Sequence, residues 1–210
     1  MARIGIMGGT FNPIHKGHIE IAKTAQEQYH LQEIWFIPNH IPAYKSTKDI
    51  VSGEQRLHMV NLAIQHYPTF KTMDIELKRE GNTYTYVTMQ ALKEQYPNNA
   101  FYFILGADSL FSFEKWLQPE LIVKNTDILC ALRNDIPLDE ILQHIAYLNK
   151  KYKNDSFHFV QCANIPCSSS DIRCYLSAKE STQNLQYQIY LNKYLDTAVY
   201  EYIKKQHLYS

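Results

Sequence analysis

Short apolar runs alternate with segments of helical periodicity from residue 3 to about residue 160. The runs of strand length are 3–7, 33–37, 70–77, 101–105, 128–132 and 157–160. Between the first two runs, Ile19, Ala22 and Ala25 lie close to one face of a helix. Alternation of this kind is typical of βαβ units, in which successive strands are parallel. The pattern therefore predicts an α/β fold with a parallel sheet of about six strands flanked by helices.

Two helix starts are marked by residues that commonly cap or begin helices. Ser52 and Gln55 form a candidate capping box, so residues 39–51 before them are expected to be a loop. Pro137 is expected at the first position of a helix that covers residues 138–152.

The C-terminal part of the chain has helical patterning throughout. It begins at about residue 168, and the stretch 196–206 carries an amphipathic stripe. The sequence contains no repeat, linker or low-complexity segment. We therefore expect a single domain of residues 1–210 with a small helical part from about residue 168 to residue 210.

The charge balance limits the partners that bulk electrostatics could attract. Lys and Arg number 21, as do Asp and Glu, so the formal net charge of the 210 residues is zero. We therefore expect no nucleic-acid partner, and any polyanion must be held by a local basic cluster. No apolar run reaches signal-peptide length or the roughly 18 residues of a membrane span. These features favour a cytoplasmic protein with no membrane partner, and a homo-oligomer is compatible with them.

The cysteine pattern does not indicate disulfides or a structural zinc site. The four cysteines are Cys130, Cys162, Cys167 and Cys174. They contain no CxxC pair, and the histidines do not combine with them at zinc-ligand spacing. We expect free thiols and no structural metal.

The segment from Gly8 to His18 carries the strongest chemical signal. It reads GGTFNPIHKGH and lies between the first predicted strand and the first predicted helix. Gly8 and Gly9 allow the backbone to approach a ligand, and free amides at a helix start favour a bound phosphate. Two histidines three positions apart are by themselves more often ordinary helix residues, but the glycine and strand context favours an anion site to which His15 and His18 point. The segment fits neither the GxGxxG nor the GxxxxGK[ST] nucleotide loop.

The same segment resembles the GGTFDPIHxGH signature of nucleotidylyltransferases, which transfer a nucleoside monophosphate from a triphosphate. Other segments resemble, in order, motifs of bacterial nicotinate mononucleotide adenylyltransferases. They are Ile37-Pro38 with Lys45, Arg56-Leu57, Glu76 to Thr85, Gly106-Ala107-Asp108 with Trp116, and Ser168 to Arg173. The resemblance covers nearly the whole chain and implies a Rossmann-like fold.

The resemblance implies a reaction between ATP and nicotinate mononucleotide. The products would be nicotinate adenine dinucleotide and pyrophosphate, in a late step of NAD synthesis, with Mg²⁺ assisting. Nucleotidyl transfer depends mainly on aligning the nucleophile and leaving group and on neutralising charge. The phosphate of the mononucleotide would be the nucleophile, so no covalent enzyme intermediate is required.

The resemblance also implies which residues hold ATP. The residues acting on the reacting phosphates would be His15, His18, Lys45 and Arg173. Further ATP-binding residues would be Gly8, Gly9, Thr10, Phe11, Gly106, Ser168, Ser169 and Ile172. Without the resemblance, Lys45 reads as a solvated loop lysine, and Ser168 as an ordinary helix N-cap that could still bind phosphate.

A second set of residues is implied for the acceptor. They are Tyr84, Thr85, Asp108, Trp116 and Arg133. Trp116 would stack on the nicotinate ring, Thr85 and the backbone at Tyr84 would bind its carboxylate, and Asp108 would bind a ribose. Arg133 would bind the mononucleotide phosphate. The structural alternative for Trp116 is an ordinary core tryptophan.

Four positions depart from the commonest family residues. Asn12 stands in place of Asp, Tyr44 in place of His, Val87 in place of Asp, and Cys167 in place of Ile. None of these four is a proposed phosphate ligand. Asn12 removes a carboxylate from the motif, and Tyr44 makes the loop 39–51 the least similar part of the site.

Other functions remain open from the sequence. Nicotinamide mononucleotide, phosphopantetheine or a riboflavin phosphate could replace the acceptor, although Trp116 with Thr85 favours the nicotinate acid. A nucleotide-binding regulatory module without turnover would retain the same fold. A class I aminoacyl-tRNA synthetase shares an HxGH-like loop, but this chain is too short to include anticodon recognition.

Overall fold

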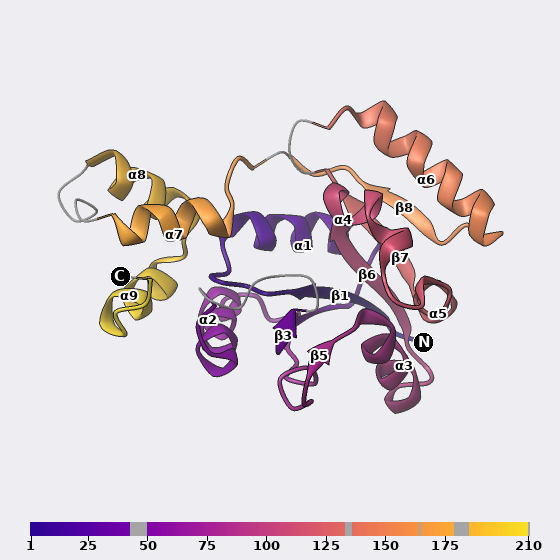
Figure 1. Ribbon diagram of the computed structural model, residues 1–210, viewed down its shortest axis with the longest axis horizontal. Helices are drawn as coiled ribbons and strands as arrows, with labels where there is room; N and C mark the ends of the chain where they lie inside the picture. The colour runs from indigo at the N-terminus through magenta and orange to yellow at the C-terminus, as the bar shows by residue number, and fades with distance from the viewer. Residues whose placement is uncertain (43–49, 133–135, 164, 179–184, 210) are drawn as a thin grey trace.

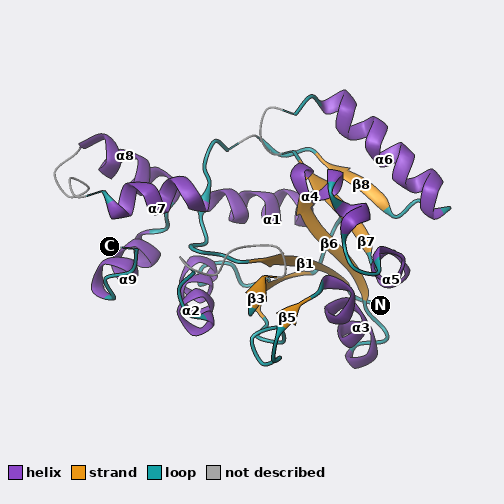
Figure 2. Ribbon diagram, in the orientation of Figure 1, coloured by secondary structure: helices purple, strands orange, loops and turns teal. Residues whose placement is uncertain are grey.

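A six-stranded parallel sheet forms the centre of the computed structural model, which describes residues 1–42, 50–132, 136–163, 165–178 and 185–209 (Figures 1 and 2). The order across the sheet is β4-β2-β1-β6-β7-β8. The strands are β1 (Arg3–Gly9), β2 (Glu33–Pro38), β4 (Phe70–Thr72), β6 (Ala100–Gly106), β7 (Asp127–Ala131) and β8 (Phe157–Val160). The α/β class, the parallel sheet and the number of strands predicted from the sequence are confirmed.

Helices cover both faces of the sheet. One face packs against α1 (Lys16–Gln28), α2 (Gly53–Ile64), α7 (Ser169–Ser177), α8 (Leu185–Tyr194) and α9 (Thr197–Lys205). The other packs against α3 (Thr85–Gln95), α4 (Ala107–Phe111), the 3-10 helix η1 (Phe113–Lys115), α5 (Pro119–Asn125) and α6 (Leu138–Tyr152). The last three helices gather at one end of the molecule, where α9 lies beside α2 (Figure 1).

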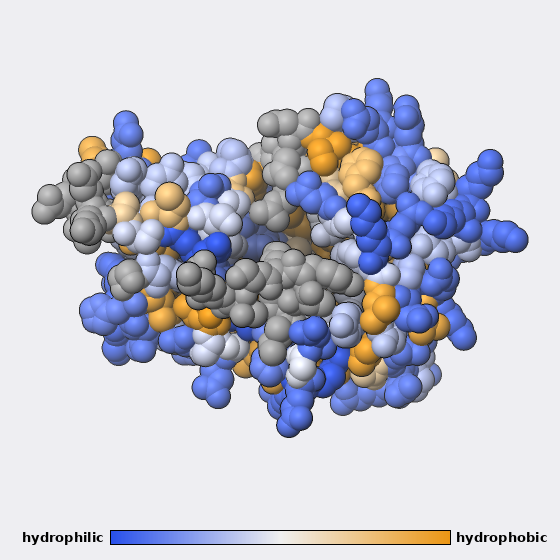
Figure 3. Space-filling model, in the orientation of Figure 1, coloured by the Kyte–Doolittle hydropathy of each residue, from blue (hydrophilic) through white to orange (hydrophobic). Residues whose placement is uncertain are grey.

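The apolar runs are continuous because the strands are buried on both faces. In β2, Ile34 and Phe36 join the core on the α1 side, whereas Trp35 and Ile37 join the core on the α3 side. Successive side chains of a strand point to opposite faces, so a central parallel strand needs apolar residues at both sets of positions. The outer surface differs: hydrophilic residues cover most of the face in Figure 3, and hydrophobic residues show there in small groups.

Several predicted boundaries agree with the structure. Ser52 is the N-cap of α2, and its side chain and that of Gln55 exchange hydrogen bonds with each other's backbone N–H groups at 3.1 and 3.2 Å. Helix α6 covers the predicted residues 138–152, but Pro137 is its N-cap and not its first helical residue. The side chain of Asp196 caps α9 by accepting a hydrogen bond from the Ala198 N–H at 2.8 Å. The four cysteines are free thiols, as predicted.

The structure differs from the predictions between β2 and α5. The third predicted strand, 70–77, ends at Thr72 because the chain then turns so that Glu76 accepts a hydrogen bond from Thr88 in α3 at 2.6 Å. The predicted loop 39–51 includes the two-residue strand β3 (Ile41–Pro42), which pairs with β5 (Asn82–Thr83). Such short elements have too few residues to show a periodic pattern. The rest of that loop, residues 43–49, lies outside the described residues.

The strand order places a crevice at the centre of the sheet. Numbered along the chain, the six strands have the order 3-2-1-4-5-6, so the direction of winding reverses between β1 and β6. Ligands of such sheets bind beyond the carboxyl ends of the strands at this switch point. Here those ends are Gly8 and Gly9 of β1 and Gly106 of β6, so the glycines of the sequence motif lie where the fold predicts a ligand.

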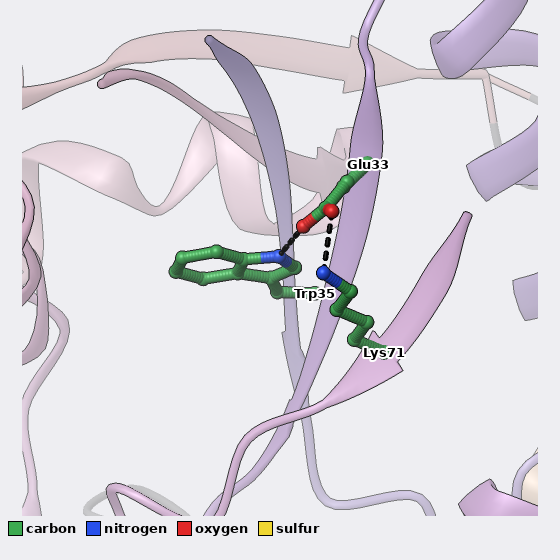
Figure 4. A network of polar contacts seen from close by, with 3 residues as sticks. All are labelled: Glu33, Trp35 and Lys71. Atoms are coloured by element: carbon green, nitrogen blue, oxygen red, sulfur yellow. Dashed lines mark hydrogen bonds and ion pairs between the residues drawn. The ribbon is translucent and has the colours of Figure 1, made fainter. Parts of the chain in front are cut away.

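A network of polar contacts connects the edge strand β4 to β2 (Figure 4). The Trp35 indole Nε1 donates a hydrogen bond to Glu33 Oε2 at 2.7 Å, and Lys71 Nζ donates to the other carboxylate oxygen of Glu33. Partial burial favours a raised pKa for Glu33, but the hydrogen bonds from Lys71 and Trp35 outweigh it and lower the pKa below its ordinary value. The ionised form of Glu33 is therefore the form that stabilises the fold.

We predict that Glu33→Gln lowers the free energy of unfolding by about 1 kcal/mol near neutral pH, because the charge-assisted hydrogen bonds are lost. A group whose pKa is lowered by folding stabilises the native state above its unfolded pKa, about 4.3 for Glu. That stabilisation is lost as the pH falls through the lower folded pKa. Urea unfolding from about pH 7 down to about pH 3 should therefore show the two proteins converging in acid. A constant difference at all pH values, or an equal loss in Glu140→Gln at an exposed position, would contradict the assignment.

Candidate active site

Two adjoining cavities, each of about 520 Å³, open at the carboxyl ends of β1 and β6. The first is lined by residues of β1, α1 and α7, including His18, Ser168, Ser169, Ser170 and Arg173. The second is lined by residues near α3 and η1, including Glu76, Tyr84, Thr85, Lys115 and Trp116. The two have a common wall made of Gly8, Gly9, Thr10, Phe103, Ser109 and Trp116. Molecules bound in the two cavities would thus meet at the end of β1.

The glycines of the common wall leave little room for a side chain. A Cβ atom on Gly8 would lie 3.2 Å from the Phe103 ring, and one on Gly9 would lie 3.1 Å from the Phe11 ring. Phe11 itself has a positive φ of 49° and is buried against Phe36 and His18. The sharp turn after β1 therefore buries the Phe11 side chain. The backbone of Gly8 and Gly9 then forms part of the common wall.

His18 lies in the first turn of α1 and lines the first cavity. Its Nδ1 accepts a hydrogen bond from the backbone N–H of His15, the N-cap residue, at 3.2 Å. A backbone N–H can only donate, so Nδ1 is unprotonated and the proton of the neutral ring is on Nε2. The arrangement turns the far nitrogen of His18 into a hydrogen-bond donor.

His15 is more deeply placed than His18. Its side chain is buried, its ring lies 3.8 Å from the His18 ring between centroids, and its Nδ1 lies 3.1 Å from the Cys167 Sγ. Gly17 is needed here, because a Cβ atom at that position would lie 2.9 Å from His15 Nδ1. His15 lines a small cavity of about 20 Å³ beside the first one. The two histidines lie side by side, as the sequence predicted. Of the two, only His18 lines the first cavity.

The N-terminus of α7 is capped by one side chain and bound to the Gly8–His18 segment by two others. Ser168 caps the helix by accepting a hydrogen bond from the Asp171 N–H at 3.1 Å. Ser169 Oγ donates to the Pro13 carbonyl at 2.9 Å, and Arg173 Nη1 donates to the Asn12 carbonyl at 2.9 Å. The amides and hydroxyls at this helix start, with the Arg173 charge, therefore face the first cavity. The side chain of Ile172 is fully buried in the core below them.

The second cavity combines an aromatic surface with the start of a helix. Trp116 is half-buried, with its ring 5.4 Å from that of Phe113 between centroids. Tyr84 is the N-cap of α3 and Thr85 its first residue, so free backbone amides lie in this wall. Asp108, in the first turn of α4, is exposed and lines neither cavity. Gly106, one of the residues expected to bind ATP, lines the first cavity.

Two predicted site residues cannot be placed. Lys45 and Arg133 lie outside the described residues, as does Tyr44. Val87 lies in α3 and is half-buried. The assignments of Lys45 and Arg133 stay predictions from the sequence.

Arg56 supports the site, although the sequence analysis gave it no role. It lies in α2, is 1% exposed, and is among the largest fully buried side chains. Its guanidinium donates hydrogen bonds to four carbonyls, which belong to Thr10, Asn39, His40 and Val51, at 2.7 to 3.2 Å. Burial lowers the pKa of Arg56 from its ordinary value. Arg56 thus binds the backbone after β1, after β2 and before α2. In the sequence, the only indication of this role is a basic residue next to the apolar positions of a predicted helix.

Tyr209 is a second supporting residue that the sequence analysis missed. Its phenol donates a hydrogen bond to Asn12 Oδ1 at 2.8 Å, and the same oxygen accepts from the Val51 N–H at 3.2 Å. Burial raises the pKa of Tyr209, against the opposing effect of the Arg173 and Arg56 charges. Asn12 therefore acts as a structural acceptor, and no pattern within the motif could have identified a partner at the other end of the chain.

The strand order and the position of the cavities at the switch point are typical of nucleotide-binding α/β folds. Residues 6–175 match the cytidylyltransferase-like family model, so the chain belongs to that family. Within it, the chain belongs to the nicotinate-nucleotide adenylyltransferases. It is 42% identical to a probable nicotinate-nucleotide adenylyltransferase of Lachnoclostridium phytofermentans, with 100% of each chain covered.

Other relatives agree with this assignment. The nicotinate-nucleotide adenylyltransferase of Bacillus subtilis is 36% identical, over 88% of this chain and 91% of its own. The Plasmodium falciparum nicotinic acid mononucleotide adenylyltransferase complexed with NaAD has the same fold, with a TM-score of 0.75, 24% identity, and coverage of 100% of this chain and 98% of its own. Among the described residues, no helix has both the length and the apolar character needed to cross a bilayer.

We predict that Arg56→Lys lowers the free energy of unfolding by about 2–4 kcal/mol, because a lysine cannot satisfy the same buried carbonyls. Urea unfolding monitored by circular dichroism would measure the loss. Arg3→Lys, at a partly exposed position over the Tyr102 ring, is the matched control and should cost less than about 1 kcal/mol. Equal effects of the two substitutions would show that the Arg56 contacts add little.

Proposed function

We propose that the protein transfers the AMP part of ATP to nicotinate mononucleotide, giving nicotinate adenine dinucleotide and pyrophosphate for NAD synthesis. The observation that carries this proposal is the common wall of the two cavities at Gly8, Gly9 and Thr10. A reaction between two nucleotides requires two pockets whose reacting ends meet. Membership of the nicotinate-nucleotide adenylyltransferase family supports the choice of substrates. The reaction would take place in the cytoplasm.

The first cavity suits the triphosphate. Arg173, the His18 Nε2–H and the amides at the start of α7 would provide positive charge and hydrogen-bond donors to a ligand there. Lys45, which the sequence places in the predicted loop 39–51, would add a further charge. Such groups are most useful for charge that develops on the α-phosphoryl group and on the departing pyrophosphate.

The second cavity suits the nicotinate mononucleotide. Trp116 offers an aromatic face, and the free amides at the start of α3, near Tyr84 and Thr85, would donate hydrogen bonds to the nicotinate carboxylate. Arg133 would bind the mononucleotide phosphate. Asp108, which is exposed outside the lining of both cavities but next to Ser109 of the common wall, would bind a ribose. The acceptor would then lie with its phosphate toward the common wall.

The chemistry is a single displacement. An oxygen of the mononucleotide phosphate forms a bond to the α-phosphorus of ATP, and the bond from that phosphorus to the bridging oxygen breaks. Pyrophosphate leaves with the electron pair, so the enzyme itself forms no covalent bond. His18 and Arg173 align the reactants and neutralise negative charge, and His15 supports His18 from below.

Mg²⁺ fits this arrangement as a companion of the triphosphate. Within the described ranges no group of three His, Cys, Asp or Glu side chains could hold a metal ion. Mg²⁺ commonly takes most of its ligands from substrate phosphates and water. The triphosphate oxygens in the first cavity would hold the ion, which when bound would neutralise phosphate charge.

We predict a clear preference for nicotinate mononucleotide when pyrophosphate release is measured with ATP and each acceptor in turn. The comparison acceptors are nicotinamide mononucleotide, phosphopantetheine and a riboflavin phosphate. The helix start near Thr85 favours a carboxylate over a neutral amide, so the amide substrate should have a kcat/KM at least about tenfold lower. A higher kcat/KM for another acceptor would overturn the substrate assignment, and no turnover with any of them would favour a regulatory module.

We predict that His18→Ala lowers kcat by about 10²–10³, because a donor to the α-phosphoryl group is lost from the transition state. The Kd for ATP, measured by isothermal titration calorimetry, should rise less than about tenfold, since the other phosphate contacts remain. His66→Ala, at an exposed position after α2, is the control and should leave both constants unchanged. Equal losses of kcat and ATP affinity in His18→Ala would mean that His18 only binds the nucleotide.

A further inference from the structure

Glu76 places a buried acidic side chain in the wall of the second cavity. The residue is 8% exposed, and it lines the second cavity but not the first. Among the described residues that line the second cavity, Glu76 is the only acidic residue, and the exposed Lys115 is the only basic one. A buried carboxylate is stable in its ionised form only when a cation or hydrogen bonds compensate its charge.

The chain itself compensates this charge only in part. Arg79 Nη2 donates a hydrogen bond to Thr88 Oγ1 at 2.8 Å, and a guanidinium can only donate, so the Thr88 hydroxyl directs its own proton to Glu76 Oε1 at 2.6 Å. Within the described part of the chain, the Glu76 carboxylate accepts no other hydrogen bond and forms no ion pair. Burial raises the pKa of Glu76, against the opposing effects of Thr88 and Arg79. A cation inside the cavity would complete the compensation.

The acceptor of the proposed reaction carries such a cation. In a pyridine mononucleotide the ring nitrogen is bonded to the ribose, so the ring is a pyridinium with a positive charge. Trp116, on which this ring would stack, offers the face of an indole, and the face of an aromatic ring attracts cations. Phosphopantetheine and riboflavin phosphate lack a ring of this charge. The second cavity therefore combines two groups that suit a flat cation.

Helix α3 separates the site for the nicotinate carboxylate from Glu76. Tyr84 and Thr85 provide free amides at the start of the helix, whereas Thr88, which binds Glu76, lies three residues beyond Thr85. Three residues are nearly one helical turn, roughly 5 Å along the axis. The carboxylate and the ring nitrogen of nicotinate are held apart by one six-membered ring, which is a comparable separation. Each end of the nicotinate can thus lie near a group of opposite charge or dipole.

We propose that Glu76 is a specificity-determining residue that selects acceptors with a cationic pyridinium ring. The inference rests on the proposed function and adds the feature of the acceptor that this carboxylate recognises. Nicotinate and nicotinamide mononucleotides carry the same ring charge, so Glu76 favours both. The amides at the start of α3 then distinguish the acid from the amide, and the two kinds of selection are independent.

The proposal can be tested by isothermal titration calorimetry of the full-length protein without ATP, at about pH 8, several units above the ordinary glutamate pKa. The ligands are nicotinate mononucleotide, nicotinamide mononucleotide and the 1,4-dihydro form of the latter, whose ring is neutral. Glu76→Gln removes the charge but retains an oxygen that can accept from Thr88. Glu80→Gln, at an exposed position of the same segment, changes the net charge equally. Thr88→Val removes the hydroxyl and leaves the Glu76 charge.

The wild type and Glu80→Gln should bind nicotinamide mononucleotide at least about tenfold more tightly than its dihydro form. In Glu76→Gln, the Kd for both charged mononucleotides should rise about tenfold, as expected for one lost charge pair, and the Kd for the dihydro form should change less than about twofold. Thr88→Val should retain the preference for the charged ring. In a pyrophosphate-release assay, Glu76→Gln should leave the KM for ATP unchanged, because Glu76 does not line the first cavity.

Equal binding of the charged and neutral rings by the wild type would overturn the proposal, and this comparison requires no variant. Unchanged Kd values in a Glu76→Gln protein that is folded by circular dichroism would also overturn it. Loss of the ring preference in Thr88→Val to the same extent as in Glu76→Gln would show that Glu76 only supports α3. Because binding is measured without turnover, a protein that prefers the charged ring but transfers no AMP would contradict the proposed function alone.

Discussion

The turn that joins β1 to α1 contains backbone carbonyl groups that are not paired within a strand or a helix. The architecture of the site depends on which side chains donate hydrogen bonds to these carbonyls. Arg56 of α2 binds the carbonyl of Thr10, Arg173 of α7 binds that of Asn12, and Ser169 binds that of Pro13. Buried backbone acceptors must find donors, because leaving one unpaired costs about 1–3 kcal/mol. The bonds from Arg173 and Ser169 also hold the start of α7 against the turn, so the donors that satisfy these carbonyls also line the first cavity.

Much of the fold could be predicted from the sequence because its central strands are buried on both faces. The runs that became β1, β2, β6, β7 and β8 are continuous and apolar, and helix α6 was bounded by Pro137 and a clear stripe. Prediction failed where structure depends on contacts between distant segments. The shortening of β4 follows from the burial of Glu76 against Thr88, and β3 and β5 exist only because they pair with each other.

The candidate site shows the same division. His15 and His18 could be identified because they share a short segment with glycines whose spacing has a direct physical use. Arg56 and Tyr209 could not, because their partners are backbone carbonyls and a side-chain amide that sequence patterns do not reveal. Asn12 illustrates the difficulty: within the motif it reads as a missing carboxylate, whereas in the fold its amide oxygen receives two donors.

The bond between Tyr209 and Asn12 joins positions 197 residues apart. During synthesis on the ribosome, residues of the sheet emerge early and can begin to associate while the rest of the chain is still being made. Asn12 cannot acquire this donor until α9 and the residues after it have left the exit tunnel. The first cavity is thus completed only after residue 209 has emerged, and a nascent chain can hold a formed sheet before it holds this cavity in full.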